Sequence, residues 1–386
     1  MTAPLFSQPL YVMAKPAGPA CNMACRYCYY LEKQRLYPQR ERTYMSDEML
    51  ELFIRRYIEA QPGNEVSFTW HGGEALLRPL SFYQRAIKLQ RQYGAGKKIF
   101  NSIQTNGVLL NAEWCRFLRD NGWLVGVSID GPADFHDEYR LNLGGKGTFN
   151  NVMRGIRLMQ QHGVEWNAMA VVNDYNADYP EEFYKFFKSI GCKYIQFTPI
   201  VERRTSSGRL AMPHEQGVLT PHSVTPEQWG SFLCGVFDLW SASDIGETFV
   251  QIFDATLAGY VGVTPGVCSM AEGCGHAAVM EYNGDVYSCD HFVFPEHRLG
   301  NIASSSFIEM MTSPQQMQFA TLKRTLPKQC QQCQYLRLCH GECPKNRFAT
   351  AADGEPGLNY LCAGYRRFFA HSAPLFSRMA ADLREG

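Results

Sequence analysis

The sequence predicts an α/β protein in which a partial, TIM-like (β/α)6 barrel is followed by a smaller cysteine-rich domain. Short apolar segments alternate with amphipathic ones over about the first 200 residues, as expected of parallel strands and their crossover helices. This pattern fades near residue 245, and cysteine, glycine and turn signals follow it. We therefore place the domains at 1–245 and 246–386.

The six predicted strands are short and apolar, which is typical of parallel strands that are covered on both faces. They span 10–15, 65–70, 98–104, 123–129, 165–172 and 194–198. In a barrel of this type, functional residues gather in the loops that follow the carboxyl ends of the strands. Motifs at these ends therefore carry the most information about function.

Amphipathic segments between the strands are predicted to be helices. Ser46 is a candidate N-cap for the first of them, and its apolar face comprises Leu50, Ile54, Tyr57 and Ile58. Further helices are predicted over 81–93, 112–121, 149–163, 180–190 and 226–241. Residues 202–225 read as a surface loop, and Asn283-Gly284 predicts a β-hairpin.

The charge balance excludes some classes of partner. Lys+Arg and Asp+Glu number 37 each, so there is no general electrostatic attraction to nucleic acid or an anionic membrane. No apolar run is long enough to span a bilayer, and 1–10 lacks the features of a secretory signal. We expect a cytoplasmic protein with neither nucleic acid nor membrane as a partner.

The first cysteine cluster follows the first predicted strand. Cys21, Cys25 and Cys28 have the spacing C-x3-C-x2-C. Three thiolates can hold a 4Fe–4S cluster and leave one iron open, as a catalytic site requires. A zinc knuckle without its fourth ligand is the alternative. The position of the loop, just before a β/α array, favours iron and sulfur.

The stretch CNMACRYC, with Tyr27 before the third cysteine, resembles the signature of the radical S-adenosylmethionine (SAM) superfamily. WHGGEAL resembles the Gly-Gly-Glu-Pro turn of that superfamily: Gly72, Gly73 and Glu74 match, and Ala75 replaces proline. The resemblance implies that the open iron chelates SAM and that the turn contacts its amino group. Alanine loosens the turn but leaves its backbone and carboxylate contacts available.

Further strand ends fit the same resemblance. QTNG ends the third strand and SIDGP the fourth. The resemblance implies that Ser128 and Arg140 reach the ribose and carboxylate of SAM, and that Val201 covers the adenine. Taken singly, Ser128 would be interpreted as a strand-end cap and Arg140 as a surface charge. Together with the cysteine loop, however, they follow the order of motifs in the superfamily, which favours contacts with SAM. The resemblance places Tyr27 in the same site.

Eight more cysteines lie in the second predicted domain. Eight thiolates can fully ligate two 4Fe–4S clusters. A pair of zinc ribbons is the main alternative, but it requires two matched C-x2-C pairs, and only one is present. The eight are Cys268, Cys274, Cys289, Cys330, Cys333, Cys339, Cys343 and Cys362.

Their spacing resembles the SPASM auxiliary-cluster domain. The resemblance implies one cluster on Cys268, Cys274, Cys289 and Cys343, and another on Cys330, Cys333, Cys339 and Cys362. Spacing alone supports only that Cys330, Cys333 and Cys339 share a site. The remaining cysteines lie in apolar surroundings and are predicted to be small buried hydrophobes; they are Cys115, Cys192 and Cys234.

Nearly the whole chain resembles anaerobic sulfatase-maturating enzymes, for example in SFTWHGGEALL, NGDVYSCDHFV and CQQCQYLRLCHGECPKNR. The resemblance implies three 4Fe–4S clusters and SAM as cofactors. It further implies that a 5′-deoxyadenosyl radical takes hydrogen from Cβ of Cys or Ser in a sulfatase polypeptide. Loss of an electron and a proton, with hydrolysis of a thioaldehyde in the case of Cys, then gives Cα-formylglycine. An unfolded or nascent sulfatase segment and a flavodoxin- or ferredoxin-type reductant are the implied partners.

Two alternatives remain open. A SPASM enzyme that forms a thioether or other crosslink in a different peptide would share most of these motifs. A non-catalytic iron–sulfur electron carrier would explain the later cysteines, but not the GGEA and SIDGP motifs at strand ends. The sequence does not distinguish Cys from Ser as the target.

Asp290 is the candidate general base. It directly follows Cys289, and the family places its proposed base at this position. A thiolate-ligated cluster is negative, so we expect the pKa of the neighbouring carboxyl group to be raised, which makes it a better proton acceptor. The alternative is that Asp290 caps a turn, in which case His291 is the next candidate.

Overall fold

The computed structural model describes residues 9–36, 44–212, 214–275 and 277–385. They form two compact units that are interleaved along the chain. The first unit comprises Met1–Ser128, Tyr139–Trp166 and Gly275–Ala320, and the second comprises Ile129–Glu138, Asn167–Cys274 and Thr321–Gly386. The domain boundary at residue 245 stays a prediction.

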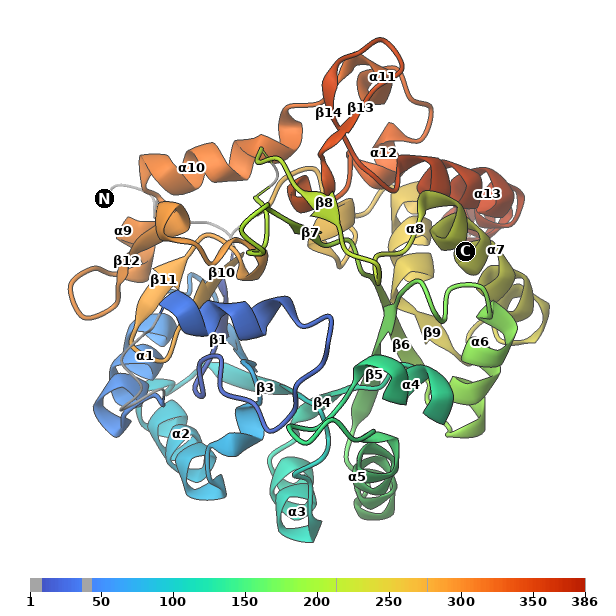
Figure 1. Cartoon of the computed structure of the whole chain (residues 1–386). Coiled ribbons are helices and arrows are strands. Elements are labelled where there is room, and N and C mark those ends of the chain that lie inside the picture. Colours follow the sequence, from blue (N-terminus) through green and yellow to red (C-terminus); the bar gives the residue numbers. More distant parts are fainter. Residues whose placement is uncertain (1–8, 37–43, 213, 276, 386) are drawn as a thin grey trace. The chain divides into compact units, whose positions relative to one another are not determined.

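The first unit is built on parallel strands that run in chain order, as predicted. They are β1 (Tyr11–Ala14), β2 (Glu65–Trp70), β3 (Lys98–Thr105) and β4 (Leu124–Ser128). On the other side of β1 lies a strand from far along the sequence, β10 (Ala277–Met280), which pairs with β1 in parallel. Figure 1 shows these orange and blue strands side by side. The strand β10 therefore carries the segment after it to the same edge as the cysteine loop.

Two antiparallel strands complete this side of the first unit, β11 (Asp285–Tyr287) and β12 (Arg298–Asn301). The predicted hairpin is confirmed, because β10 and β11 meet at a turn in which Gly284 has φ of +85° and donates to Glu281 O at 2.9 Å. A positive φ is readily adopted by glycine. The segment that follows β11 begins with Ser288, Cys289 and Asp290.

The predicted helices of the first unit are confirmed as α1 (Asp47–Ala60), α2 (Leu80–Tyr93), α3 (Ala112–Asp120) and α5 (Phe149–His162). The Ser46 side chain caps α1 by accepting a hydrogen bond from Met49 N–H at 3.2 Å. The apolar face of α1 is buried, as expected. Phe53 of α1 packs edge to face on Phe68 and Trp70 of β2, which fixes the carboxyl end of β2.

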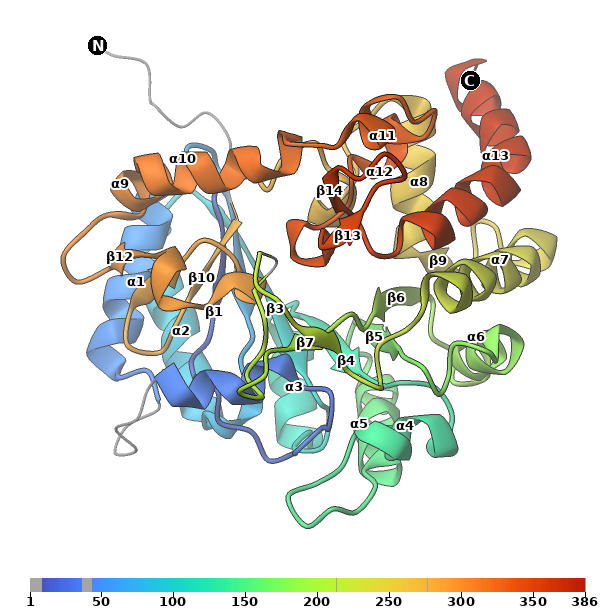
Figure 2. The same cartoon turned by 45° about the horizontal axis from the view of Figure 1, so that its top comes forward.

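In the second unit, β5 (Trp166–Val172), β6 (Tyr194–Pro199) and β9 (Phe249–Val250) run parallel. The predicted helices α6 (Pro180–Ser189) and α7 (Pro226–Ser243) are confirmed. The long terminal helix α13 (Cys362–Glu385) was not predicted; it packs beside α7 (Figure 2). A Cβ atom on Gly230 would lie 2.9 Å from Gly364 Cα, so this glycine pair permits the close approach.

The segment 202–225 is not only a loop. It contains a two-stranded ribbon of β7 (Arg203–Arg204) and β8 (Val218–Leu219). The other helices and strands of the described residues are shorter: α4 (Ala133–Tyr139), α8 (Gln251–Val261), α9 (Phe307–Met311), α10 (Pro314–Thr321), α11 (Lys328–Gln331), α12 (Leu336–Cys339), β13 (Ala349–Thr350) and β14 (Pro356–Leu358). Short 3-10 helices include η1 (Tyr29–Leu36), η2 (Ala75–Leu77), η4 (Asp290–Phe292) and η6 (Leu322–Arg324).

Candidate active site

The cysteine loop lies directly after β1 in the first unit. Cys21, Cys25 and Cys28 are partly buried, and none of them forms a disulfide. Burial raises the pKa of Cys21 to about 12, and the charges of Glu74, Cys25 and Cys28 add to this rise. The three thiols therefore lie close enough to influence one another. Such a set gains stability when a metal cofactor takes the place of the protons.

The arrangement of these thiols bears on the zinc alternative. Within the described ranges, no three Cys, His, Asp or Glu side chains converge on a point where they could share a single metal ion. A structural zinc ion requires four ligands around one centre. In a four-iron cluster each thiolate binds a different iron atom, so its ligands stand apart. A four-iron cluster therefore does not require such convergence.

The GGEA turn after β2 is fastened to the entrance of the cysteine loop. Gly73 N–H donates to Gly18 O and Glu74 N–H donates to Ala20 O, both at 2.8 Å. A Cβ atom on Gly73 would lie 2.2 Å from Ala20 O. Only glycine allows the two backbones to come this close. The turn and the cysteine loop consequently keep a fixed relation.

The Glu74 carboxylate is buried and faces the QTNG turn. It accepts hydrogen bonds from Leu76 N–H at 2.9 Å, from the Thr105 hydroxyl at 2.7 Å and from Asn106 N–H at 2.8 Å. We expected this carboxylate to be available to SAM, but three donors of the chain engage it. Its observed role is to join two strand-end turns, and a direct contact with SAM stays a prediction.

Arg140 lies against the cysteine loop and is only 7% exposed. Its Nη1 donates to the Tyr27 hydroxyl at 2.8 Å. Burial raises the pKa values of Cys28 and Glu74, and the Arg140 charge opposes both rises. The alternative that Arg140 is a surface charge is therefore wrong. Ser128 ends β4 and accepts from Gln104 Nε2 at 3.0 Å.

Val201 belongs to the second unit and is buried there. Its carbonyl oxygen accepts a hydrogen bond from Lys345 Nζ at 2.6 Å. The structure gives this residue no described link with the residues of the cysteine loop. Its place over the adenine of SAM stays a prediction.

Asp290 is held from two sides by residues next to the cysteine loop. The Lys15 ammonium nitrogen, directly after β1, lies 2.7 Å from Asp290 Oδ1. The Tyr29 hydroxyl, directly after Cys28, donates to Asp290 Oδ2. Asp290 itself follows Cys289. Its contacts with Lys15 and Tyr29 therefore link two segments that carry predicted cluster ligands.

The protein groups around Asp290 lower its pKa, whereas the rise expected from the sequence concerned the charge of a bound cluster and stays a prediction. Burial is the largest single effect and acts to raise this pKa, but the charges of Lys15, His71 and His291 and the hydrogen bond from Lys15 together outweigh it. The pKa of the carboxyl group lies well below its usual range. This lowering could not be predicted from local sequence patterns, because the pairing of β1 with β10 brings Lys15 and Asp290 together.

Several residues that the sequence did not indicate complete the buried network around Lys15 and Asp290. His71 Nδ1 lies 3.3 Å from Lys15 Nζ, and the ring of Tyr30 lies 4.2 Å from the same nitrogen. Burial, followed by the charge of Lys15, lowers the pKa of His71 to about 3. The Tyr30 hydroxyl donates to Glu281. The signal available in the sequence was Lys15, which ends a predicted apolar strand. Lysine is rarely buried without a partner, so its position indicated a buried acidic or aromatic neighbour.

Four cysteines of the second unit line one cavity of about 350 Å³, together with Tyr335 and Phe369. They are Cys330, Cys333, Cys339 and Cys362. Burial raises the pKa values of Cys330, Cys339 and Cys362, and neighbouring members of the set contribute to each rise. The structure thus brings together the four residues predicted to hold one auxiliary cluster.

Three other cysteines form a second group in this unit. Burial raises the pKa values of Cys274 and Cys343, and the charge of Cys268 adds to both. Cys289 belongs to the first unit, so its place in this ligand set stays a prediction. Cys115, Cys192 and Cys234 are buried single residues, as expected.

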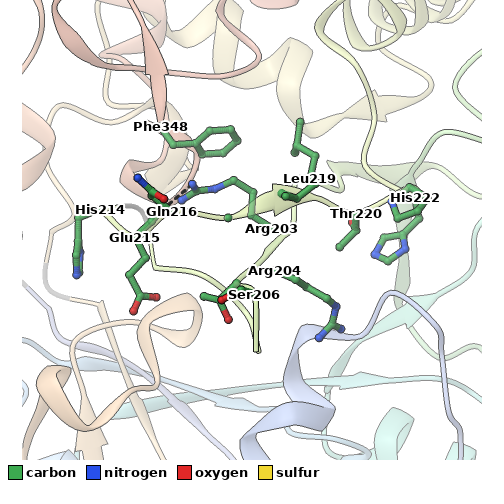
Figure 3. A pocket seen from close by; sticks show the side chains of 14 residues that line it. Arg203, Arg204, Ser206, His214, Glu215, Gln216, Leu219, Thr220, His222 and Phe348 are labelled. Carbon is green, nitrogen blue, oxygen red and sulfur yellow. Dashed lines mark hydrogen bonds between the residues drawn. The ribbon is translucent and has the colours of Figure 1, made fainter. Parts of the chain in front are cut away.

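A pocket of about 1260 Å³ opens beside the β7–β8 ribbon of the second unit (Figure 3). The guanidinium group of Arg203 lies 4.0 Å from the centre of the Phe348 ring, and Arg203 also donates to Glu215 O at 3.0 Å. Arg204 and His222 line the same pocket, and Val218 of β8 is 78% exposed. Its lining thus combines cationic, polar and apolar side chains.

Two family models match the chain. The radical SAM superfamily matches residues 16–187, and the iron-sulfur cluster-binding SPASM domain matches residues 268–334. The predicted fold class, a radical SAM domain followed by a SPASM domain, is confirmed. These matches also support iron–sulfur clusters and SAM as cofactors.

Curated relatives match over almost the full length. A serine-type anaerobic sulfatase-maturating enzyme of Bacteroides thetaiotaomicron is 60% identical, covering 98% of this chain and 93% of the relative. One of the same type from Klebsiella aerogenes is 38% identical, covering 96% and 87%. A cysteine-type enzyme of Clostridium perfringens is 32% identical, covering 97% and 100%.

The solved structure of native anSMEcpe with bound AdoMet matches with a TM-score of 0.87 and 31% identity, covering 97% of this chain and 100% of that chain. The same protein with AdoMet and the Cp18Cys peptide matches with the same TM-score. In the part of the chain that the structure describes, no helix combines the length and apolar character needed to cross a membrane.

Proposed function

This chain belongs to the anaerobic sulfatase-maturating enzymes, which oxidise a Cys or Ser of a sulfatase polypeptide to Cα-formylglycine, and we propose that its own target is a serine. Support comes from the relatives: two serine-type enzymes are 60% and 38% identical, whereas the cysteine-type enzyme is 32% identical. The bound SAM and iron–sulfur clusters supply the radical and redox chemistry.

The catalytic cluster is assigned to Cys21, Cys25 and Cys28. This assignment is supported by three partly buried free thiols on one loop and by the nearby cations Lys15 and Arg140, both of which lower the pKa of Cys28 against the effect of burial. The SAM contacts are assigned to the residues that the superfamily resemblance indicates. They are Tyr27, Gly72, Gly73, Glu74, Ser128, Arg140 and Val201.

The eight later cysteines are assigned to two auxiliary clusters. Cys330, Cys333, Cys339 and Cys362 form one set, and the cavity that all four line supports this grouping. Cys268, Cys274, Cys289 and Cys343 form the other set. The mutual influence of Cys268, Cys274 and Cys343 supports three of its members.

Asp290 is the general base, and its contacts with Lys15 and Tyr29 are the observation that carries this assignment. The ion pair with Lys15 favours the ionised carboxylate, which is the form that can accept a proton. Loss of a hydrogen atom from the substrate's Cβ makes the attached hydroxyl group much more acidic. A weakly basic carboxylate can then take its proton, while Lys15 fixes the orientation of the acceptor.

Matched sulfatase peptides that differ only in Ser or Cys test the proposed target. Each is incubated anaerobically with the holoenzyme, SAM and a reductant, and the products are identified by mass spectrometry. We expect formylglycine from the serine peptide at the higher kcat/KM. A clear preference for the cysteine peptide would contradict the serine assignment. A crosslink in place of an aldehyde would instead support a different peptide-modifying activity.

The polypeptide partner is an unfolded or nascent sulfatase segment, and its flank lies in the pocket beside the β7–β8 ribbon. The exposed Val218 supports this location. Val218→Asp should raise KM for a long sulfatase peptide without changing kcat. Val263→Asp is the control, because Val263 is also exposed, at 57%, but does not line this pocket. An unchanged KM for Val218→Asp would exclude this location.

A flavodoxin or ferredoxin is the proposed reductant, and the yield of formylglycine with each as sole electron donor tests this.

A further inference from the structure

Lys323 of the second unit is a buried lysine, 1% exposed, in the short helix η6. Its ammonium group donates to Cys268 O at 2.5 Å, to Ser269 O at 2.7 Å and to Ala271 O. An ammonium group has three N–H donors. All three are used on one short loop, the loop that carries Cys268.

The charge of Lys323 lies among cysteine thiols. Burial raises the pKa values of Cys268 and Cys274, and the charge of Lys323 is the largest effect that opposes each rise. Burial in turn lowers the pKa of Lys323, whereas Glu342, Cys274, Cys268 and Cys343 raise it. A buried cation is costly unless negative charge balances it. The thiolates of these cysteines supply such charge.

Arg347 holds the backbone of Lys323 in place. Its Nη1 donates to Lys323 O at 3.0 Å and to Leu322 O at 3.3 Å. On its other side, Nε donates to Gly341 O at 2.8 Å and Nη2 to Glu342 O at 3.0 Å. The loop between Cys339 and Cys343 and the segment of Lys323 are thus fixed to one guanidinium group. The backbone at Lys323 therefore cannot shift away from the loop of Cys339 and Cys343 without breaking these contacts.

We propose that Lys323 is a positioning residue that places a fixed positive charge against the cluster bound by Cys268, Cys274 and Cys343, and so raises the reduction potential of that cluster. The proposal depends on the ligand assignment given above. Reduction adds an electron to a cluster that already carries negative charge. A nearby cation in a low-dielectric interior stabilises the reduced form more than the oxidised form. Lys323 would therefore favour acceptance of the substrate's electron.

Anaerobic redox titration of the holoenzyme, followed by EPR, tests this inference. In Lys323→Met, we expect the ratio of oxidised to reduced auxiliary cluster at a given potential to rise about tenfold, which is a downward shift of about 59 mV for a one-electron couple. Arg324→Met is the matched control. It removes the same charge from the adjacent residue, whose side chain is 65% exposed, and we expect no shift.

Further variants separate the possible failures. Cys268→Ala should remove the signal that Lys323→Met shifts; if all clusters persist in Cys268→Ala, the ligand assignment is wrong. If that assignment holds and Lys323→Met has the wild-type potential, the inference about Lys323 is wrong.

Lys323→Arg covers the case in which the methionine variant loses its iron. It keeps the charge, so we expect it to retain full iron content and a potential near that of the wild type. Loss of the auxiliary cluster from Lys323→Arg as well would show that charge at this position is not what matters, and would overturn the proposal.

Discussion

The Lys15 ammonium group lies 2.7 Å from the Asp290 carboxylate, and this ion pair joins the start of the cysteine loop to the residue after Cys289. Tyr29, which follows Cys28, completes the link by donating to the same carboxylate. The proposed proton acceptor is therefore oriented by residues of the segment that carries the proposed catalytic cluster. Removal of the hydrogen atom from the substrate's Cβ and of the proton from the attached hydroxyl group both require such a fixed relation.

Asp290→Asn should separate SAM cleavage from product formation. Asparagine has the size of aspartate but cannot accept the proton. We expect full iron content and continued release of 5′-deoxyadenosine, while formylglycine formation falls by a factor of about 10²–10⁴. Glu296→Gln is the control, because Glu296 is an exposed carboxylate in the same segment. Formylglycine formation at the wild-type rate in Asp290→Asn would move the search for the base to His291.

Lys15→Met should move the pH dependence of the reaction. Burial raises the pKa of Asp290, and Lys15 makes the largest contribution that lowers it. Without that charge the pKa rises, so the carboxylate is protonated over a wider acidic range. We expect the acidic limb of the pH profile for formylglycine formation to shift to higher pH. Exposed Lys88→Met provides the control, and an unshifted limb would exclude electrostatic control by Lys15.

The elements predicted from local patterns agree with the structure, because each depends on neighbouring residues. The strands β2 and β5, the Ser46 cap and the Asn283-Gly284 turn belong to this group. The pairing of β1 with β10 could not be predicted in this way, because nothing local indicates that Tyr11 lies opposite Ala277. The Lys15–Asp290 pair depends on that pairing.

The candidate site likewise combines features that local sequence predicts with features that depend on distant parts of the chain. The spacing of Cys21, Cys25 and Cys28 identified the loop, and the GGEA motif identified the turn. The engagement of the Glu74 carboxylate by Thr105 and Asn106 was not predicted, because it depends on how two strand ends face each other. The helix α13 was missed because its apolar residues are interspersed with charged ones and with Pro374, which normally disfavours a helix interior.

Replacing Cys21, Cys25 and Cys28 together with alanine should remove one of three clusters. We expect the iron content to fall from about twelve to about eight atoms per chain, with an equal loss of sulfide. Cleavage of SAM should be abolished. A triple substitution at the isolated buried cysteines, Cys115, Cys192 and Cys234, to serine or alanine should leave the iron content unchanged. Stoichiometric zinc with little iron in anaerobically prepared wild type would contradict the cluster assignments.

Gly73→Ala should disturb the cysteine loop, because the new methyl group would lie 2.2 Å from Ala20 O and 2.6 Å from Pro19 O. Backbone atoms cannot yield as a flexible side chain can, so we expect a loss of about 1–3 kcal/mol in the free energy of unfolding, together with weaker SAM binding. Gly63→Ala is the control, because a Cβ atom there meets nothing within 4 Å. Denaturant titration and SAM binding measure both effects, and equal behaviour of the two variants would refute the proposed constraint.

Ala75→Pro restores the residue that the superfamily usually has after Gly-Gly-Glu, and the local backbone can accept it. Ala75 is the first residue of η2, a position whose N–H has no partner within the helix and which favours proline. The preceding residue, Glu74, has φ of −137° and ψ of 112°, an extended conformation that suits a residue before proline.

We expect SAM binding to be retained, and the free energy of unfolding to be unchanged or to rise by about 0.4–1 kcal/mol, because proline restricts the unfolded chain. Ala75→Gly is the opposite control and should lower stability, since glycine adds freedom to the unfolded chain. Isothermal titration with SAM and denaturant unfolding measure the two quantities, and complete loss of SAM binding in Ala75→Pro would show that the backbone of this turn differs from the one described.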